Sequence, residues 1–327
     1  MFRRIKSSRL NRLLLSPLLP LLGVPTAGRA SPTPVGIIKG GDRGEAVRRA
    51  LELMPPPQVR DRKVMVKPNF NTADPAPGST HIDTLRALIE ELQERGADRI
   101  IIGERSGPPD SQEVLEEKGV LDLAREKGVE VVNFDQLPPE DLVHFSDPRL
   151  HWKNGFHIPR LLQEVDLIIA TPCLKTHQYG GEFTLALKLA VGIIPNSGND
   201  YMRELHNSPD MRRMIAEINL AYRPDLFILD GVEAFTTGGP ASGTRVKADI
   251  TLVGQDPVAL DAVGVALLKK LGSTEKIMET PIFELEQIAR AGELGLGITG
   301  PQQIELSSDN EAGRSLAREL EKILARG

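Results

Sequence analysis

From residue 34 onward, short apolar runs alternate with longer stretches in which apolar residues recur at helical spacing. A short run such as 165–170, rich in β-branched side chains, is typical of a buried strand. A longer stretch such as 81–95 places its apolar side chains along one side of a helix. Further strands are predicted at 35–39, 63–67, 99–103, 129–134, 225–229, 248–253 and near 303–306, and further helices at 45–53, 111–127 (broken), 208–221, 257–271, 281–291 and from about 309.

This alternation predicts the fold class. Strands that alternate with helices form a mainly parallel sheet with helices on both of its faces. We therefore expect a single large α/β domain over residues 31–327. Residues 136–160 interrupt the alternation with several prolines, three histidines and the single tryptophan, and we expect an irregular or hairpin excursion there.

Residues 1–30 differ from the rest of the chain. They contain six basic residues and no acidic one, with an apolar run at 13–24 and small residues near the end. This order resembles a secretory signal, so we expect export to the periplasm or another extracytoplasmic compartment. The alternative is a disordered basic leader on a cytoplasmic protein. No apolar run approaches the roughly 20 residues that a membrane span requires, so no span is expected in the mature chain.

Composition argues against several classes of function. Without the basic leader, the formal net charge of −5 becomes −11 for residues 31–327, and only 4% of the residues are aromatic. Nucleic-acid binding draws on basic patches and aromatic stacking, so it is not expected. Cys173 is the single cysteine, which excludes an internal disulfide and a cluster held by four thiolates of this chain.

Polar residues follow several of the predicted strands. Lys67 ends one strand and Asn69 follows it, while Lys175 and His177 follow the strand at 165–170. Each cluster taken alone is also explained as a turn or a helix cap. Because ligands of open parallel sheets bind beyond the carboxyl ends of the strands, we expect these side chains to share one site. Polar residues also follow two other predicted strands: residues 104–107 come after the strand at 99–103, and Asp230 and Glu233 come after the strand at 225–229.

Two other features belong with these residues. A glycine-rich loop contains Gly238 and Gly239, which could present backbone N–H groups to an anion, although a hairpin turn explains the same glycines. Asp261 lies on a predicted helix that is apolar nearly all round. A buried carboxylate needs a lysine, a metal or backbone donors as its partner, and Lys175 and Lys67 are the candidate cations. We therefore expect Asp261 in the same cleft as these two lysines.

Six short motifs stand in a fixed order along the chain: Lys67-Pro-Asn69, Leu174-Lys-Thr-His177, Leu187-Lys188, Asp230-Gly231, Gly239-Pro240 with Gly243, and Asp256-Pro-Val-Ala-Leu-Asp261. Their order and spacing resemble the domain-of-unknown-function family 362 across roughly residues 35–270. Many members of that family carry ferredoxin-type cysteine clusters, so the resemblance implies a link to iron–sulfur proteins. This chain lacks those cysteines, and no iron–sulfur cluster is expected from it alone.

Two classes of function fit these residues. In the first, a small anionic ligand binds at the carboxyl edge of the sheet, Lys175 and His177 supply acid–base chemistry, and a divalent metal is held by oxygen ligands. The anion ligands are then Lys67, Asn69, Gly238 and Gly239, and the metal ligands are Asp230, Glu233 and Asp261. In the second, the protein is a non-catalytic accessory or assembly partner of an iron–sulfur or other redox protein.

Overall fold

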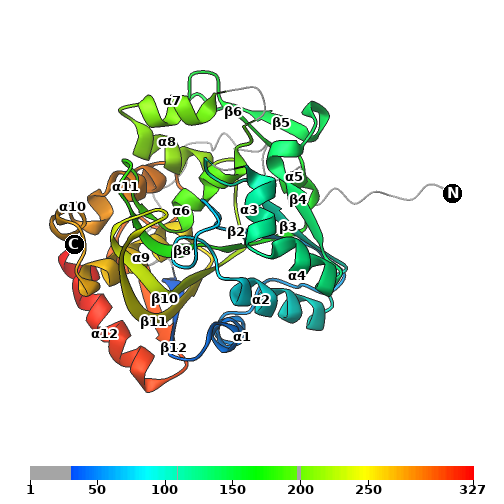
Figure 1. Ribbon diagram of the computed structural model, residues 1–327. Coiled ribbons are helices and arrows are strands. Elements are labelled where there is room, and N and C mark those ends of the chain that lie inside the picture. Colours follow the sequence, from blue (N-terminus) through cyan, green and yellow to red (C-terminus); the bar gives the residue numbers. More distant parts are fainter. Residues whose placement is uncertain (1–30, 109, 197–199) are drawn as a thin grey trace, which may run out of the picture.

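The structure is a computed structural model that describes residues 31–108, 110–196 and 200–327. Its central feature is a mixed β-sheet (Figure 1). The strands of this sheet are β1 (Thr33–Lys39), β2 (Lys63–Pro68), β3 (Arg99–Glu104), β4 (Glu130–Asn133), β7 (Leu167–Thr171), β8 (Cys173–His177), β9 (Glu182–Thr184), β10 (Leu226–Gly238), β11 (Gly243–Gly254) and β12 (Ile304–Ser308). They lie in the order β12-β1-β11-β10-β7-β2-β3-β4, with β8 beside β10 and β9 beside β8.

Most neighbouring strands of this sheet are parallel. Strand β2 pairs in parallel with β3 and β7, β3 with β4, β10 with β7 and β8, and β1 with β12. Strand β11 runs antiparallel to both of its neighbours, and β9 is antiparallel to β8. The predicted mainly parallel α/β sheet is therefore confirmed, with an antiparallel hairpin inserted near one side.

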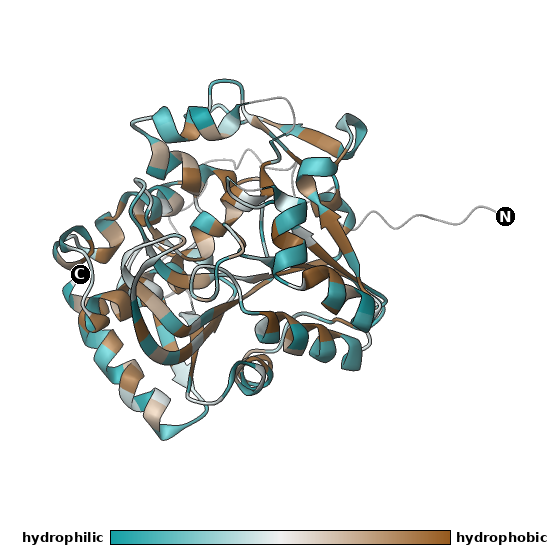
Figure 2. Cartoon of the chain, viewed as in Figure 1, coloured by the Kyte–Doolittle hydropathy of each residue, from teal (hydrophilic) through white to brown (hydrophobic). Residues whose placement is uncertain are grey.

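Helices cover both faces of the sheet, as predicted. One face packs against α1 to α4 around a core that includes Val66 and Ile228, and the other packs mainly against α6, α8, α9, α11 and α12. Figure 2 shows apolar residues along the strands and in bands along the helices. The helices are α1 (Arg43–Leu53), α2 (Ile82–Glu94), α3 (Ser111–Glu117), α4 (Val120–Lys127), α5 (Leu161–Glu164), α6 (Ala186–Leu189), α7 (Tyr201–Asn207), α8 (Met211–Ile218), α9 (Pro257–Leu271), α10 (Glu275–Glu279), α11 (Glu286–Glu293) and α12 (Glu311–Arg326), with short 3₁₀ helices at 134–136, 139–141, 190–193, 282–284 and 301–303.

Helix α9 begins where the sequence predicts it. The Asp256 side chain accepts the backbone N–H groups of Val258 and Ala259 at 2.8 and 2.9 Å, and Pro257 occupies the first turn. A carboxylate cap followed by proline favours this start because proline has no N–H that needs a partner there. The helix then crosses the core, and nearly all of its side chains are buried.

The excursion at 136–160 contains a small hairpin of its own. Strands β5 (Leu142–Phe145) and β6 (Phe156–Pro159) pair antiparallel and form a separate sheet. Trp152 lies between them in sequence, is buried, and donates its Nε1–H to the carbonyl oxygen of Met214 at 3.2 Å. This contact attaches the hairpin to helix α8.

Two parts of the sheet differ from the predicted pattern. The chain continues after Pro172 as the buried strand β8, where no strand was predicted. Strand β10 extends through Asp230 and Gly231 to Gly238, past its predicted end at 229, because a register shift after Gly231 lets the pairing with β11 continue. A β-bulge of this kind lets a strand absorb residues that otherwise end it.

The predicted leader, residues 1–30, lies outside the described residues. In the described part of the chain, no helix is both long enough and apolar enough to cross a membrane.

Candidate functional site

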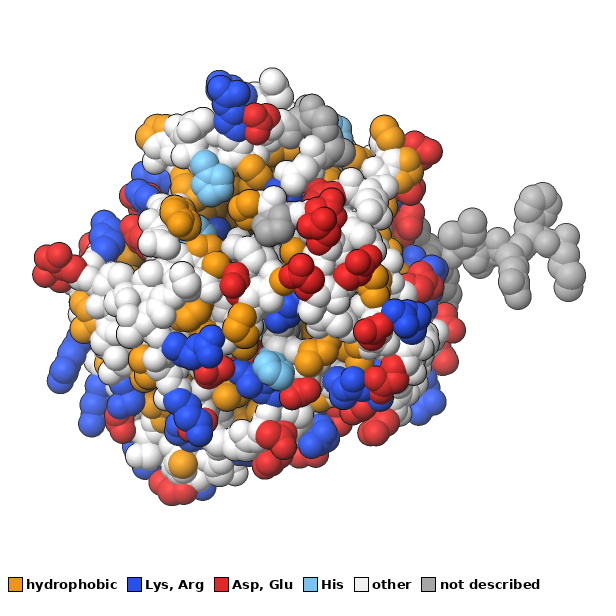
Figure 3. All heavy atoms as spheres, in the orientation of Figure 1, with side chains coloured by type: hydrophobic (Ala, Val, Ile, Leu, Met, Phe, Trp, Pro, Cys, Tyr) orange, Lys and Arg blue, Asp and Glu red, His pale blue; other side chains and the backbone are white. Residues whose placement is uncertain are grey.

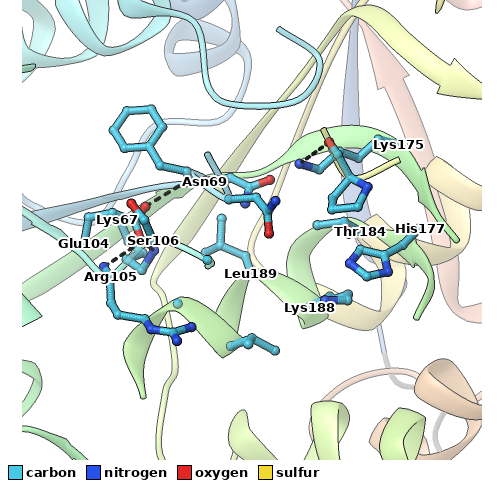
Figure 4. Close-up of a pocket in the computed structure, with 16 residues that line it drawn as sticks. Lys67, Asn69, Glu104, Arg105, Ser106, Lys175, His177, Thr184, Lys188 and Leu189 are labelled. Atoms are coloured by element: carbon cyan, nitrogen blue, oxygen red, sulfur yellow. Dashed lines mark hydrogen bonds and ion pairs between the residues drawn. The ribbon is translucent and has the colours of Figure 1, made fainter. Parts of the chain in front are cut away.

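A polar cavity lies beyond the carboxyl ends of strands β2 and β3, bounded also by β8 and helix α6 (Figure 4). The space that the centres of water-sized atoms can occupy in this cavity is about 50 Å³. This is enough for a few waters or one small ion. The lining residues are Lys67, Asn69, Phe70, Asn71, Glu104, Arg105, Ser106, Gly107, Lys175, His177, Thr184, Lys188, Leu189, Val191, Gly192 and Pro240.

Lys67 and Glu104 form a buried ion pair in the wall of this cavity. Nζ of Lys67 lies 2.6 Å from Oε1 of Glu104, and Glu104 also accepts the backbone N–H groups of Phe70 and Arg105 at 3.1 and 2.8 Å. Burial raises the pKa of Glu104 to about 7, against the opposing effects of Lys67 and the two N–H donors. A Cβ on Gly192 would lie 2.9 Å from both charged atoms, so only glycine lets this segment cover the pair.

Lys175 is fully buried and donates to two backbone carbonyl groups. Its Nζ donates to the carbonyl oxygen of Gly78 and, at 3.4 Å, to that of Pro240. Burial lowers the pKa of Lys175. Two of its N–H bonds are therefore committed to fixed acceptors, as those of Lys67 are committed to Glu104 and to the carbonyl oxygen of Pro68 at 2.7 Å.

Lys188 differs from these two lysines because no hydrogen bond or ion pair to another described residue engages its ammonium group. It lies on α6 and is 9% exposed. Burial, followed by the nearby charges of Lys175 and Arg105, lowers the pKa of Lys188 to about 7. A Cβ built on Gly181 would lie 2.5 Å from Cε of Lys188 and 3.2 Å from Nδ1 of His177, so this glycine lets the two side chains approach each other.

Five polar side chains that line the cavity have a buried atom without a hydrogen-bond partner. Only three described residues elsewhere have such an atom. Each unpartnered buried polar atom costs about 1–3 kcal/mol, so a cluster of five indicates that waters or a ligand supply the missing partners. The atoms are Oδ1 of Asn69, Nε of Arg105, Oγ of Ser106, Nδ1 of His177 and Oγ1 of Thr184.

The cavity has an excess of positive charge. Arg105 is 5% exposed, and its Nη2 donates to Oδ1 of Asn196 at 2.5 Å while its Nε lies 3.8 Å from Asp135. Lys175 and Lys188 add to this charge, whereas the single carboxylate in the lining is paired with a lysine. Figure 3 shows acidic and basic side chains interspersed over the face in view. Charged donors that converge on a small, poorly solvated space suit an oxyanion.

The structure brings four of the predicted site residues together at this cavity: Lys67, Asn69, Lys175 and His177. Lys175 and His177 follow β7 as predicted, but they lie on a strand of their own, β8, which was not among the predicted strands. Side chains two residues apart on a strand point to the same side, which explains why both reach the cavity. Burial, followed by Lys188 and Lys175, lowers the pKa of His177 far below its usual value, so its ring is neutral at neutral pH.

Asp230 and Glu233 lie elsewhere, on strand β10. Oδ2 of Asp230 accepts from Nε of Arg43 at 2.9 Å and from Oγ1 of Thr84 at 2.8 Å. Arg43 also reaches Glu233, with Nη2 and Oε2 3.4 Å apart. These partners belong to α1 and α2, so the carboxylate of Asp230 faces the layer of helices on the opposite side of the sheet from α6. Neither Asp230 nor Glu233 lines the cavity that contains Lys175.

The carboxylate of Asp261 does not pair with a lysine, contrary to our expectation. It accepts the backbone N–H groups of Ala186 and Leu187 at 2.7 and 3.2 Å, at the start of α6. Backbone donors, one of the three kinds of partner considered from the sequence, are what the structure shows. Burial raises the pKa of Asp261 to about 8, against the effect of these two donors. Asp261 thereby fixes the turn of helix that carries Lys188.

The three predicted metal ligands are consequently not gathered in one place. Within residues 31–108, 110–196 and 200–327, no group of three or more histidine, cysteine, aspartate or glutamate side chains is arranged to hold a metal ion. Binding of a divalent metal stays a prediction.

Gly238 and Gly239 form part of the hairpin between β10 and β11, the alternative explanation given for these glycines. Both have positive φ, and a Cβ on Gly239 would lie 2.0 Å from the carbonyl oxygen of Thr176. The N–H of Gly239 donates to the carbonyl oxygen of Ser242 at 2.6 Å, so it is not free for an anion. The hairpin reaches the cavity through Pro240, which supplies a carbonyl acceptor for Lys175.

Lys188, Arg105 and Thr184 were not predicted as site residues. Arg105 was visible as part of the polar cluster after β3 but was given no function. Lys188 also had a signal, because it is the one charged residue in the apolar run at 185–194. The sequence holds no comparable signal for Thr184, whose place depends on the pairing of β9 with β8.

Comparison with known proteins gives two findings. The sequence model of a family described as "Domain of unknown function (DUF362)" matches residues 64–266. The "Thylakoid-associated protein sll1697" of Synechocystis sp. is 26% identical over 214 residues, which cover 63% of this chain and 63% of the relative. The chain thus matches less than two thirds of the length of this curated relative. The family match spans β2 to the greater part of α9 and includes every residue that lines the cavity.

Proposed function

The chain belongs to the family of domains of unknown function DUF362, and from this premise we propose that it binds a small anionic ligand in the cavity beside Lys188. The ligand is an oxyanion such as a carboxylate or a phosphate group. The proposed ligand-binding residues are Lys188, Arg105, Asn69, Ser106, Thr184 and His177, with Lys67 and Lys175 as the charged wall behind them.

One observation carries this proposal: the unpartnered buried polar atoms gather in this cavity. An anion would accept hydrogen bonds from Nε of Arg105, Oγ of Ser106 and the ammonium group of Lys188. Asn69 could donate through its amide nitrogen if its side-chain amide is turned over, because the oxygen and nitrogen of an amide are distinguished only by their hydrogen bonds. Water alone would satisfy the same atoms but would leave the excess positive charge uncompensated.

A thermal-shift screen at constant ionic strength tests the proposal. We expect phosphate, sulfate or a small carboxylate to raise the melting temperature, because a ligand at a hundredfold excess over Kd stabilises the folded state by about 2.7 kcal/mol. For a chain of this size that corresponds to roughly 4 °C or more. Chloride at equal ionic strength is the control. If no oxyanion raises the melting temperature above that control, the proposal is wrong.

Anion affinity should depend on pH through Lys188. The pKa of this lysine is about 7 in the free protein, and a bound anion favours the protonated form. The affinity is therefore greatest below pH 7 and falls as pH rises, by up to about tenfold per pH unit between pH 7 and 9. Calorimetric titration with sulfate, which keeps its charge over this range, measures the effect. An affinity that is constant between pH 6 and 9 would exclude Lys188 as the titrating group.

Other assignments from the sequence remain proposals with their own tests. Elemental analysis of the purified protein tests binding of a divalent metal at Asp230 or Glu233. The Synechocystis relative is named as thylakoid-associated, and such an association supports the accessory function for a redox system. Co-purification with a cluster-bearing redox protein would favour that function over a ligand-binding one. Sequencing the amino terminus of the mature protein tests export, which predicts a start near residue 31.

A further inference from the structure

We propose that Lys188 is a nucleophilic amine that forms an imine with the carbonyl carbon of a small 2-oxo acid bound in the cavity. This inference rests on the proposed function, because the carboxylate of the 2-oxo acid is the anion that the cavity holds. It adds a covalent step and a substrate class to that function.

Lys188 is singled out by comparison with the other two lysines in the cavity wall. The ammonium groups of Lys67 and Lys175 donate to fixed oxygen acceptors of the protein. No described residue accepts a hydrogen bond from Lys188, so its Nζ alone is free to approach a ligand atom. A lysine becomes a nucleophile when it is desolvated beside other cations, and both conditions hold here. Consistently, the pKa of Lys188 is about 7, so a large fraction is the free amine at neutral pH.

The neighbours of Lys188 supply the other requirements of imine formation. Nε of Arg105, 3.8 Å from Oδ1 of Asp135, and Oγ of Ser106 are buried donors without a hydrogen-bond partner and can hold the carboxylate. His177 lies next to the lysine. A Cβ atom built on Gly181 would lie 2.5 Å from Cε of Lys188 and 3.2 Å from Nδ1 of His177, so these two atoms border the same small space. That Nδ1 has no partner in the protein, so the neutral ring can form a hydrogen bond to the ligand.

The proposed step balances without an oxidant or a reductant. The free amine of Lys188 attacks the carbonyl carbon with its nitrogen lone pair, which forms a C–N bond and places the carbonyl π electrons on oxygen. A proton moves from nitrogen to this oxygen, which gives a carbinolamine. A proton from solvent then reaches the hydroxyl group, the C–O bond breaks, and water leaves. The product is an iminium ion that carries the positive charge of that proton.

Reductive trapping tests this inference. The full-length protein is incubated with pyruvate and sodium cyanoborohydride, digested, and mapped by tandem mass spectrometry. We expect the reduced pyruvate adduct on Lys188 at least tenfold more abundant than on any other lysine, and we expect it to be absent in Lys188→Arg. Lactate is the control ligand because it has the same carboxylate but no carbonyl group. Thermal shift with pyruvate and with lactate is measured in parallel, without the reductant.

The outcomes separate this inference from the proposed function. Thermal shifts with both acids but no adduct on Lys188 would overturn the imine and leave anion binding intact. No thermal shift with either acid and no adduct would overturn the imine, and the proposed function would fall as well if phosphate and sulfate also gave no thermal shift. An adduct spread evenly over surface lysines would also overturn the inference. The adduct should form faster as pH rises from 6 to 8, because attack needs the free amine, whereas reversible binding of lactate should weaken over the same range.

Discussion

Lys188→Met is expected to weaken anion binding by about tenfold to a hundredfold and, in the same variant, to stabilise the ligand-free protein. A hydrogen bond from a charged donor to an anion is worth about 1.5–3 kcal/mol, which sets the loss of affinity. The gain in stability follows from the lowered pKa of Lys188, since each pKa unit corresponds to about 1.4 kcal/mol of penalty on the charged form. Methionine keeps the length of the side chain and removes that penalty.

Calorimetric titration with sulfate and urea denaturation at pH 7 measure the two effects. We expect the free energy of unfolding to rise by about 2 kcal/mol or more, since a buried charge without a protein partner is removed. Lys322→Met on the exposed surface of α12 is the matched control, and it should change stability by less than about 0.5 kcal/mol and leave binding unchanged. Unchanged sulfate affinity in Lys188→Met would contradict the assignment of this lysine to the ligand.

Asp261→Ala is expected to destabilise the protein by about 3–5 kcal/mol, because it leaves two buried N–H groups without acceptors and opens a cavity. The groups are those of Ala186 and Leu187 at the start of α6. Since this turn carries Lys188, any folded protein that remains should also bind the anion more weakly. Urea denaturation and calorimetric titration measure the two losses.

Asp261→Asn is the matched variant, because the amide oxygen can still accept the N–H of Ala186. The pKa of Asp261 is raised to about 8 in the folded protein, so folding takes up a proton between pH 4 and pH 8. The stability that the protonated carboxyl contributes is fully present below about pH 4 and is lost as pH rises toward 8. As pH rises over that range, the free energy of unfolding of Asp261→Asn should therefore increase relative to that of the wild type by up to about 1.4 kcal/mol per pH unit. Equal pH dependence of the two proteins would show that the carboxylate is ionised in the folded state.

Much of the sheet is predictable from the sequence because its central strands are buried on both faces. The runs at 63–67, 99–103 and 165–170 each contain at least three consecutive apolar residues, and each is close to the observed strand β2, β3 or β7. Strand β8 was not predicted because a lysine and a histidine alternate in it with Leu174 and Thr176, a pattern that is typical of an exposed loop or edge. Its burial depends on β10 continuing beyond Asp230, which a local pattern does not show.

The site was predicted where it depends on the ends of parallel strands. Lys67 and Asn69 follow β2, and the cavity lies there as the general rule for such sheets expects. Asp230 lies outside the cavity because its carboxylate is held by Arg43 and Thr84 of α1 and α2, contacts that the local sequence does not show. The prediction failed for the partner of Asp261 because a buried carboxylate can bind backbone N–H groups, which carry no sequence signal. Lys188, like Asp261, is a lone charge in an apolar run, and the same pattern therefore indicates a buried charge at both positions.

Anomalous diffraction from crystals soaked in selenate tests the central claim most directly, because it locates an oxyanion without reference to activity. We predict a selenium peak in the cavity, with selenate oxygens within hydrogen-bond distance of Nζ of Lys188 and the side chain of Arg105. Crystals of Lys188→Met soaked in the same way should show a weaker peak there or none. Selenate peaks confined to surface lysines and arginines, with the cavity filled by water, would contradict the account.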